Sequence, residues 1–233
     1  MSRQAGVVAV TSLAFEAYIA RGPGVSVLCH QALELSAALG LEVERGASGI
    51  ISFGIAGGLA PGLVAGDWVV ASRVRNGKDA VATDRAWAQR LLERLPHAIN
   101  ADIVGVDAMI LSPLEKSRLY GQTGAAAVDM ESHIAAKIAA QHRIPFVACR
   151  VIIDAAHRAL PPAATVGLRS DGTPDVLAVF RSVRQKPSQL LDLMRIAFDA
   201  RIARRALRLG RKQLGEGFGF PLTTVLRSDL VVA

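Results

Sequence analysis

The chain has 233 residues, of which 51% are hydrophobic and 20% are charged, and its net charge is +7. This composition is typical of a globular protein with a sizeable core and excludes a disordered chain. The charge is uneven, because residues 1–150 carry a net +1 and residues 151–233 a net +6. The two cysteines, Cys29 and Cys149, form no CxxC pair, which predicts inert thiols in a reducing compartment and no metal site.

The first third of the chain alternates short apolar runs with helical patterns. Val7–Val10 is predicted to be a strand, and Ser12 the N-cap of the helix that follows. A second strand is expected at Val25–Cys29, and then a helix from about 31 to 39 that Gly40 ends. The initial apolar run is interrupted by Glu16, so it is interpreted as a strand and not as a signal peptide.

A continuous apolar run, Gly49–Phe53, predicts a parallel strand that is buried on both faces. The glycine-rich residues 54–58 after it are predicted to be a loop. They match neither the P-loop nor the GxGxxG pattern. The loop is either a place where the backbone approaches a ligand closely or a plain tight turn.

The middle of the chain continues the alternation. We expect a strand at Trp68–Ser72, an amphipathic helix at Thr83–Leu95, a strand at Asp102–Asp107 and a helix from Ser112 to Tyr120. A helical pattern and a strand, Ile144–Ile153, then lie between two acidic residues, Glu131 and Asp154. Carboxylates at such strand ends face a ligand crevice in α/β folds, although Glu131 is equally well explained as an acid favoured by the helix dipole.

The C-terminal part is more basic. A turn is predicted at 171–174, a helix at 176–183, a long helix from about 188 to 214 and short apolar runs at 224–226 and 230–232. Most basic residues of the long helix fall within an arc of roughly 120°. This face is either a solvated surface or a contact with anionic lipid.

Several motifs together resemble one family. Val-Asp-Met-Glu-Ser at 128–132, Arg-Val-Ile-Ile-Asp at 150–154 and Phe-Gly-Ile-Ala-Gly-Gly-Leu-Ala-Pro at 53–61 are similar to the purine nucleoside phosphorylase and methylthioadenosine/adenosylhomocysteine nucleosidase superfamily. The run at 155–164 resembles its branch of bacterial hopanoid-associated phosphorylases. The resemblance implies one α/β domain over residues 1–233, with a twisted, mainly parallel mixed sheet flanked by helices and a basic extension from about 174.

The resemblance also implies roles for the motif residues. Asp154 would be the general acid that protonates the leaving purine, and Glu131 would accept hydrogen bonds from the ribose hydroxyls. Glu16 would orient the nucleophilic water of a hydrolase, or contact the sugar and phosphate of a phosphorylase. Without the resemblance, Glu16 is most simply a surface residue in a first helical turn.

Further residues would contact the substrate. Met130 would pack on the ribose, and the glycine segment would lie near the anomeric carbon through Gly54, Ala56 and Gly57. Met109 and Ile110 would form a wall of the base pocket, or else belong to the core.

Three positions depart from the family pattern. Ile153 replaces a serine before the catalytic aspartate, and Ile55 replaces a frequent serine in the glycine segment. Ser52 stands where phosphorylases of the family place a phosphate-binding arginine, for which either Arg21 or an arginine from a partner subunit could substitute. The sequence therefore leaves phosphate and water open as nucleophiles.

The leading hypothesis is a cytoplasmic enzyme that releases adenine from a 5′-substituted adenosine, with adenosylhopane as the substrate that the branch implies. The alternatives are a soluble nucleosidase or phosphorylase for methylthioadenosine or another purine nucleoside, and a non-catalytic basic protein that binds lipid or nucleic acid. The absence of an aromatic stacking array argues against nucleic acid. No cofactor or metal is expected apart from phosphate as a co-substrate. The resemblance implies a homo-oligomer, and the basic helix would hold the enzyme at the inner membrane surface.

Overall fold

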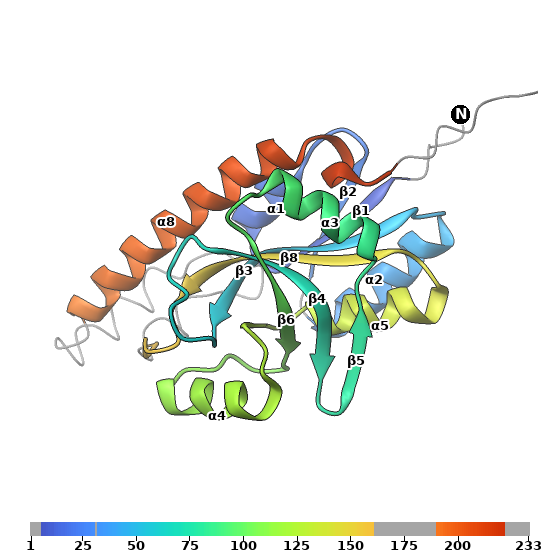
Figure 1. Ribbon diagram of the computed structural model, residues 1–233. Coiled ribbons are helices and arrows are strands. Elements are labelled where there is room, and N and C mark those ends of the chain that lie inside the picture. The colour runs from blue at the N-terminus through green and yellow to red at the C-terminus, as the bar shows by residue number, and fades with distance from the viewer. Residues whose placement is uncertain (1–5, 31, 161–189, 222–233) are drawn as a thin grey trace, which may run out of the picture.

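The computed structural model describes residues 6–30, 32–160 and 190–221. The turn predicted at 171–174, the helix at 176–183 and the apolar runs after 222 lie outside these residues. The described part is an α/β fold in which helices cover both sides of a twisted sheet (Figure 1). In its described part the chain therefore has the α/β architecture that we expected.

Eight strands form one mixed sheet in the described part of the chain. They are β1 (Val7–Thr11), β2 (Val25–Cys29), β3 (Gly49–Gly58), β4 (Trp68–Asn76), β5 (Asp79–Ala82), β6 (Ile99–Gly105), β7 (Ala127–Asp129) and β8 (Phe146–Asp154). The path runs β2-β1-β3-β7-β6-β4-β5, and β8 pairs with both β3 and β4. Strands β3, β8, β4, β6 and β7 therefore pair in a closed ring, and most pairs are parallel, as the sequence predicts.

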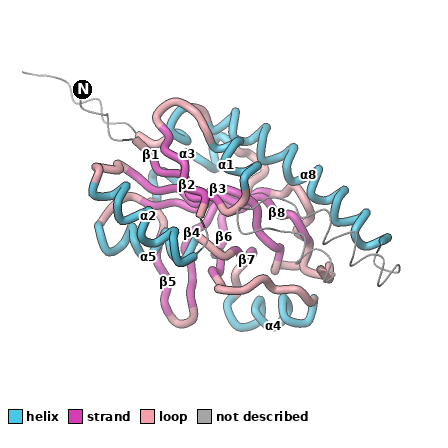
Figure 2. The backbone as a smooth tube through the Cα atoms, turned by 180° about the vertical axis from the view of Figure 1, so that it is seen from behind, coloured by secondary structure: helices cyan, strands magenta, loops and turns pink. Residues whose placement is uncertain are grey.

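Each face of the sheet buries its own apolar cluster. The helices are α1 (Ala14–Ala20), α2 (Ala32–Glu44), α3 (Arg85–Arg94), α4 (Pro113–Thr123), α5 (Ser132–His142) and α8 (Leu190–Leu214). Side chains of α1, α3 and α8 share one cluster, and those of α2 and α5 the other. Figure 2 shows α2 and α5 side by side on one side of the strands and α8 along the opposite edge. The apolar runs of the central strands are continuous because both faces are covered.

The glycine-rich segment is a strand and not the predicted loop. Strand β3 continues to Gly58 and pairs with β8 from Ile50 to Gly57, with a register shift between Ala56 and Gly57. Its last two residues also pair with β7. Small residues therefore stand where β3 meets the backbones of both β7 and β8.

Other boundaries also differ from those predicted. Helix α2 runs through Gly40 to Glu44, and the turn after it contains Gly46 with φ +91°. A glycine inside a helix lowers its stability without ending it, which is why Gly40 is a poor stop signal. Helix α1 has Leu13 and not Ser12 at its N-cap. Strand β4 is longer than predicted, since the unforeseen hairpin partner β5 extends it.

The long helix α8 is docked by close contact and by one buried arginine. A β-carbon at Gly210 would lie 2.2 Å from the Trp68 ring, so α8 approaches β4 more closely than a side chain allows. Arg211, which is 8% exposed, donates to the carbonyl of Ala20 at 3.0 Å and to that of Gly215 at 2.6 Å. Its guanidinium also stacks 4.2 Å from the centre of the Phe218 ring. These contacts hold α1, α8 and the turn after α8 together.

We expect Gly210→Ala to lower the free energy of unfolding by about 1–3 kcal/mol, because the methyl group overpacks the Trp68 contact. Gly40→Ala is the matched control: this glycine also lies inside a helix but a β-carbon meets nothing within 4 Å. It should stabilise the protein by about 0.5–1 kcal/mol through helix propensity. Urea unfolding measures both, and a stabilising effect at both positions would contradict the close docking of α8.

Candidate active site

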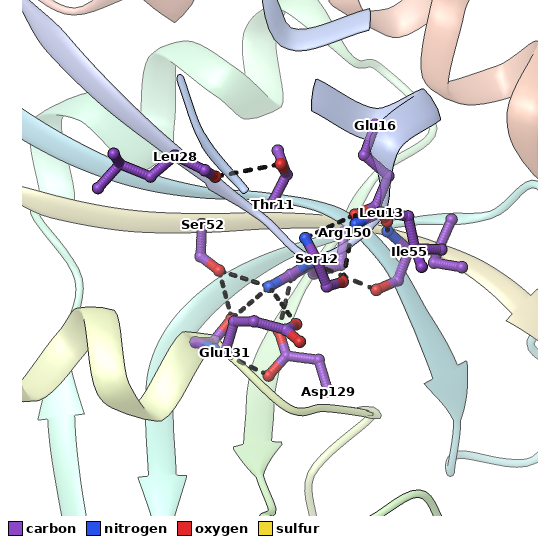
Figure 3. A network of polar contacts seen from close by, with 11 residues as sticks. Thr11, Ser12, Leu13, Glu16, Leu28, Ser52, Ile55, Asp129, Glu131 and Arg150 are labelled. Atoms are coloured by element: carbon purple, nitrogen blue, oxygen red, sulfur yellow. Dashed lines mark hydrogen bonds and ion pairs between the residues drawn. The ribbon is translucent and has the colours of Figure 1, made fainter. Parts of the chain in front are cut away.

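Arg150 lies at the centre of a buried polar cluster in the middle of strand β8 (Figure 3). Its side chain is fully buried, with Nε 2.6 Å from Asp129 Oδ2. Nη2 donates to Ser52 Oγ at 2.6 Å and lies 3.4 Å from Glu131 Oε2. A buried guanidinium needs compensating charges, and here two carboxylates and a hydroxyl surround it.

The start of α5 supplies the acidic side of this cluster. Asp129, at the end of β7, accepts a hydrogen bond from the Ser132 amide at 3.1 Å and one from the Ser132 hydroxyl. Asp129 thereby caps the helix, while Glu131 makes no side-chain capping bond. Glu131 is itself the N-cap residue of α5, a position that the helix dipole favours for an acid, and its carboxylate lies 3.4 Å from Arg150 Nη2.

Glu16 joins the same cluster from α1. It is 0% exposed, so the interpretation as a surface residue is wrong. Oε2 accepts from the amides of Ser12 and Leu13 at 3.0 Å each and from the Ser12 hydroxyl at 3.2 Å, while Oε1 accepts from the Ile55 amide at 2.7 Å. Oε2 thus accepts three of these bonds and Oε1 one, so Oε1 is the less occupied oxygen of the carboxylate.

The pKa values of these groups reflect burial among like charges. Burial raises the pKa of Glu131 to about 7, opposed by Arg150 and reinforced by the nearby carboxylates of Asp129 and Glu16. Burial also raises the pKa of Glu16, against the effects of Arg150 and of the backbone hydrogen bonds. Burial lowers the pKa of Arg150, but the three carboxylates outweigh it and leave the pKa raised. The cluster thus holds two carboxyl groups, Glu131 and Glu16, whose pKa values are raised by burial.

Asp154, at the end of the same strand, belongs to a second buried pair. Its carboxylate is bonded to the ammonium of Lys116 on α4, and the two side chains are 8% and 1% exposed. Lys116 also donates to the carbonyl of Ala155 at 3.0 Å and to that of Arg158 at 3.3 Å. Burial raises the pKa of Asp154, while the Lys116 ammonium opposes that shift.

Glycines of β3 lie against both centres. A β-carbon at Gly54 would lie 2.5 Å from Glu16 Oε1 and 2.7 Å from Arg150 Nη1. A β-carbon at Gly57 would lie 3.5 Å from Asp154 Oδ1. The backbone of β3 between these glycines, with Ala56 buried, therefore runs from the Arg150 cluster to Asp154. The close approach seen here is to the chain's own side chains, and an approach of this segment to a ligand stays a prediction.

The remaining predicted site residues lie at different places. Met130 is partly buried next to Glu131. Ile110 packs against the apolar cluster of Leu59 and Val128, while Met109 is 40% exposed in the loop before α4.

Arg21 lies away from the Arg150 cluster. It lines an open cleft of about 570 Å³ between α1 and α8, together with Arg208 and Lys212. Neither Glu16 nor Asp154 lines that cleft, so the fold of a single chain does not bring Arg21 to them.

Sequence reasoning missed both basic residues of the site. An arginine inside the otherwise apolar run of 146–153 is a usable signal, because arginine is almost never fully buried unless it is paired. Lys116 gave no such signal, since it stands among polar residues of α4. Among the described residues, no group of three or more His, Cys, Asp or Glu side chains is arranged to hold a metal ion.

A family model described as the phosphorylase superfamily matches residues 19–194. The chain therefore belongs to the phosphorylase superfamily. This confirms the predicted superfamily, and it also confirms the prediction that the protein is an enzyme that cleaves glycosidic bonds. The matched segment contains Arg150, Glu131, Asp154 and Lys116, while Glu16 precedes it. The comparison with curated protein sequences gave no significant match.

Solved structures share the fold at low identity. Futalosine hydrolase of Helicobacter pylori has 12% identity and a TM-score of 0.64, covering 93% of this chain and 97% of its own. The 5′-methylthioadenosine/S-adenosylhomocysteine nucleosidase of Neisseria meningitidis, in complex with methylthio-immucillin-A, has 15% identity and a TM-score of 0.63, with coverages of 88% and 97%. A mutant of the corresponding H. pylori enzyme, with 5′-methylthioadenosine in the active site, has 13% identity and a TM-score of 0.61, with coverages of 91% and 100%. These likenesses confirm the predicted fold.

We expect Arg150→Met to destabilise the protein by about 3–5 kcal/mol at neutral pH, because it leaves buried carboxylates without a cation. The loss should shrink at pH 5, where carboxyl groups with raised pKa values are protonated and need no partner. Arg73→Met is the control: this arginine pairs with Asp102 at 3.0 Å but is 52% exposed, so we expect at most about 1 kcal/mol. Urea unfolding at the two pH values measures this, and a pH-independent loss for Arg150→Met would contradict the charge balance.

Proposed function

We propose that the enzyme hydrolyses the N-glycosidic bond of a 5′-substituted adenosine and releases adenine. The observation that carries this proposal is the arrangement along β8 and β3. A buried carboxyl group, Asp154, lies beside Gly57 near the end of β3, and the carboxylates of Glu16 and Glu131 lie around Arg150, which approaches the same strand at Gly54. Cleavage of such a bond needs an acid for the leaving base and negative charge near the sugar, which these two centres supply.

Each acidic residue has a role in this reaction. Asp154 donates a proton to the purine as the bond to the anomeric carbon breaks, and a pKa raised by burial favours the protonated form that this step needs. Glu131 accepts hydrogen bonds from the ribose hydroxyls, with Met130 beside it. Oε1 of Glu16, the less occupied carboxylate oxygen and the one next to Gly54, orients the attacking water. Met109 and Ile110, before α4, contribute to the base side.

Water is favoured over phosphate by the charge of the Arg150 cluster. The only cation in direct contact with Asp129, Glu131 and Ser52 within the described residues is Arg150, and Asp129 already pairs with it. A phosphate dianion would enter a region where buried carboxylates outnumber the cation, and that repulsion is strong at low dielectric. The hydroxyl oxygen of Ser52, at the position of the missing arginine, already accepts a hydrogen bond from Arg150. Arg21 lines the cleft beside α8.

The substrate within this class is proposed to carry a hydrocarbon tail, as in adenosylhopane. Helix α8 supports this, because its exposed surface joins a basic stripe to an apolar one. The basic stripe contains Arg201, Arg205, Arg208 and Lys212. The apolar stripe contains Met194, Phe198 and Leu209, each more than half exposed. Figures 1 and 2 both show α8 along the outer edge of the molecule. Such a helix binds an anionic bilayer surface, and no described helix is long and apolar enough to cross one.

Adenine release from adenosine, methylthioadenosine and a lipid-linked adenosine, with and without phosphate, tests the reaction. We expect release without phosphate, and a loss of roughly 10²–10⁴-fold in kcat for Asp154→Asn, the typical value of a general acid. Asp107→Asn is the control, since its side chain is 90% exposed, and it should be fully active.

Release that requires phosphate would show a phosphorylase and overturn the hydrolytic step. No release from any of the three substrates by a folded protein would overturn the enzymatic proposal and favour a binding protein. A preference for methylthioadenosine would point to an ordinary soluble nucleosidase.

Sedimentation with vesicles that contain anionic phospholipid tests the membrane surface. We expect the protein to sediment at low salt and to be released as salt is raised, because exposed charges are screened. A variant with Arg201, Arg205 and Arg208 changed to Gln should stay in solution, whereas Arg73, Arg85 and Arg90 changed to Gln removes the same charge elsewhere and should leave sedimentation intact. Equal loss in both variants would mean that net charge alone drives binding.

A further inference from the structure

Lys116 has a buried ammonium group to which the proposed reaction assigns no role. A lysine is almost never fully buried unless it is paired. Lys116 is 1% exposed, and its three N–H donors have three acceptors: the Asp154 carboxylate and the carbonyls of Ala155 and Arg158. Because every donor is used, the position of Nζ relative to the carboxylate is fixed.

The elements around Lys116 hold that position. Helix α4 begins at Pro113 with a capping box, in which Ser112 and Glu115 bond to each other's backbone amides. The segment after β8 is tied to the same helix start by the bond from the Leu160 amide to the Leu111 carbonyl, at 2.9 Å. Lys116 thus joins α4 to the segment after β8, and that segment is itself anchored to the start of α4.

The ion pair also divides the two oxygens of Asp154. Lys116 binds Oδ2, whereas Oδ1 does not have this contact. The carboxylate as a whole lies against the glycine segment of β3, because a β-carbon at Gly57 would be 3.5 Å from Oδ1 and 3.7 Å from Oδ2, and this is the side on which the substrate is proposed to bind. This leaves Oδ1 as the oxygen that can carry and deliver a proton.

We propose that Lys116 is a positioning residue for the general acid: it orients Asp154 through Oδ2 and stabilises the carboxylate charge that remains after Asp154 gives its proton to the leaving base. This inference rests on the proposed function and adds a residue to it. In the step, the Oδ1–H bond breaks and an N–H bond forms on the purine, while the glycosidic bond breaks with its electron pair going to the base. Lys116 keeps all three of its protons throughout.

Other charges near Asp154 are few among the described residues. Asp199 of α8 acts to raise the pKa of Asp154, and it is itself 3.7 Å from Arg158 Nε. His157, Arg158 and Asp199 line a small adjacent cleft of about 210 Å³. Lys116 is the only one of these groups that contacts the carboxylate directly and the one that opposes the effect of burial.

The test compares Lys116→Met, Lys116→Arg and Lys137→Met, the last an exposed lysine of α5. Removing the ammonium takes away a cause that lowers the pKa of Asp154, so that pKa should rise. Since the protonated carboxyl is the active form, the fall of kcat/KM at alkaline pH should move to higher pH in Lys116→Met. Its kcat for an adenine nucleoside should drop about tenfold or more, as expected for a weaker and less well-oriented acid.

A substrate whose leaving group needs no proton separates this role from a structural one. Nitrophenyl riboside is such a substrate, because its leaving group, nitrophenolate, is a stable anion. Lys116→Met should therefore cleave it at nearly the wild-type rate. Lys116→Arg keeps the positive charge and should restore the wild-type pH profile in part, and Lys137→Met should match the wild type. Equal losses on both substrates, or an unmoved alkaline limb, would overturn the proposal.

A readout without turnover keeps the inference separate from the proposed function. The carboxyl ¹³C signal of Asp154, assigned by its absence in Asp154→Asn, should titrate at higher pH in Lys116→Met than in the wild type. If this shift is seen but the wild type cleaves no nucleoside, the proposed function fails and the pairing stands. If nucleosides are cleaved but the signal does not move, Lys116 does not act on Asp154.

Discussion

A positive charge buried in the middle of the sheet is the constraint on which the site depends. Arg150 occupies a strand position that is otherwise apolar, and an unpaired guanidinium there would cost several kcal/mol. The elements that meet it all supply a compensating group: β7 and α5 bring Asp129 and Glu131, β3 brings Ser52 and α1 brings Glu16. In the proposed reaction, the acids near the developing cationic sugar are thus also the acids that keep Arg150 in the core. The proposed function and the stability of the fold would then rely on the same contacts.

The second constraint is space, and it comes from β3. Arg150 and Glu16 approach that strand only because Gly54 has no side chain, and Asp154 lies over Gly57 for a similar reason. Strand β7 pairs with Gly57 and Gly58 at the end of β3. A segment that pairs on both edges and faces polar groups leaves little room for side chains. The run of small residues is therefore explained by packing of the site before any ligand is considered.

The sequence predicted the local features better than the long-range ones. Period and composition located most helices and strands, and they placed Glu131 and Asp154 at strand ends, because such signals are local. Gly40 misled, since a glycine inside a helix and one at its end look alike. The extent of β3 could not be inferred, because its pairing with β7 and β8 joins segments that are far apart in the sequence. Lys116 was missed for the same reason: nothing near it in sequence indicates that its partner is Asp154.

The two basic residues of the site act on their acids in different ways, and the difference fits the direction in which charge moves during glycosidic cleavage. Around Arg150 the carboxylates outnumber the cation, so the region is suited to a sugar that becomes positive. At Asp154 one acid meets one cation in a nearly dry contact. In the proposed reaction a proton leaves Asp154 for the base at this end, and Lys116 balances the charge that is left behind. A surplus of negative charge at the base end would oppose this transfer, because it would make the carboxyl hold its proton more tightly. In the proposed reaction, the separation of the two centres along one strand therefore lets a single buried site stabilise opposite charges at its two ends.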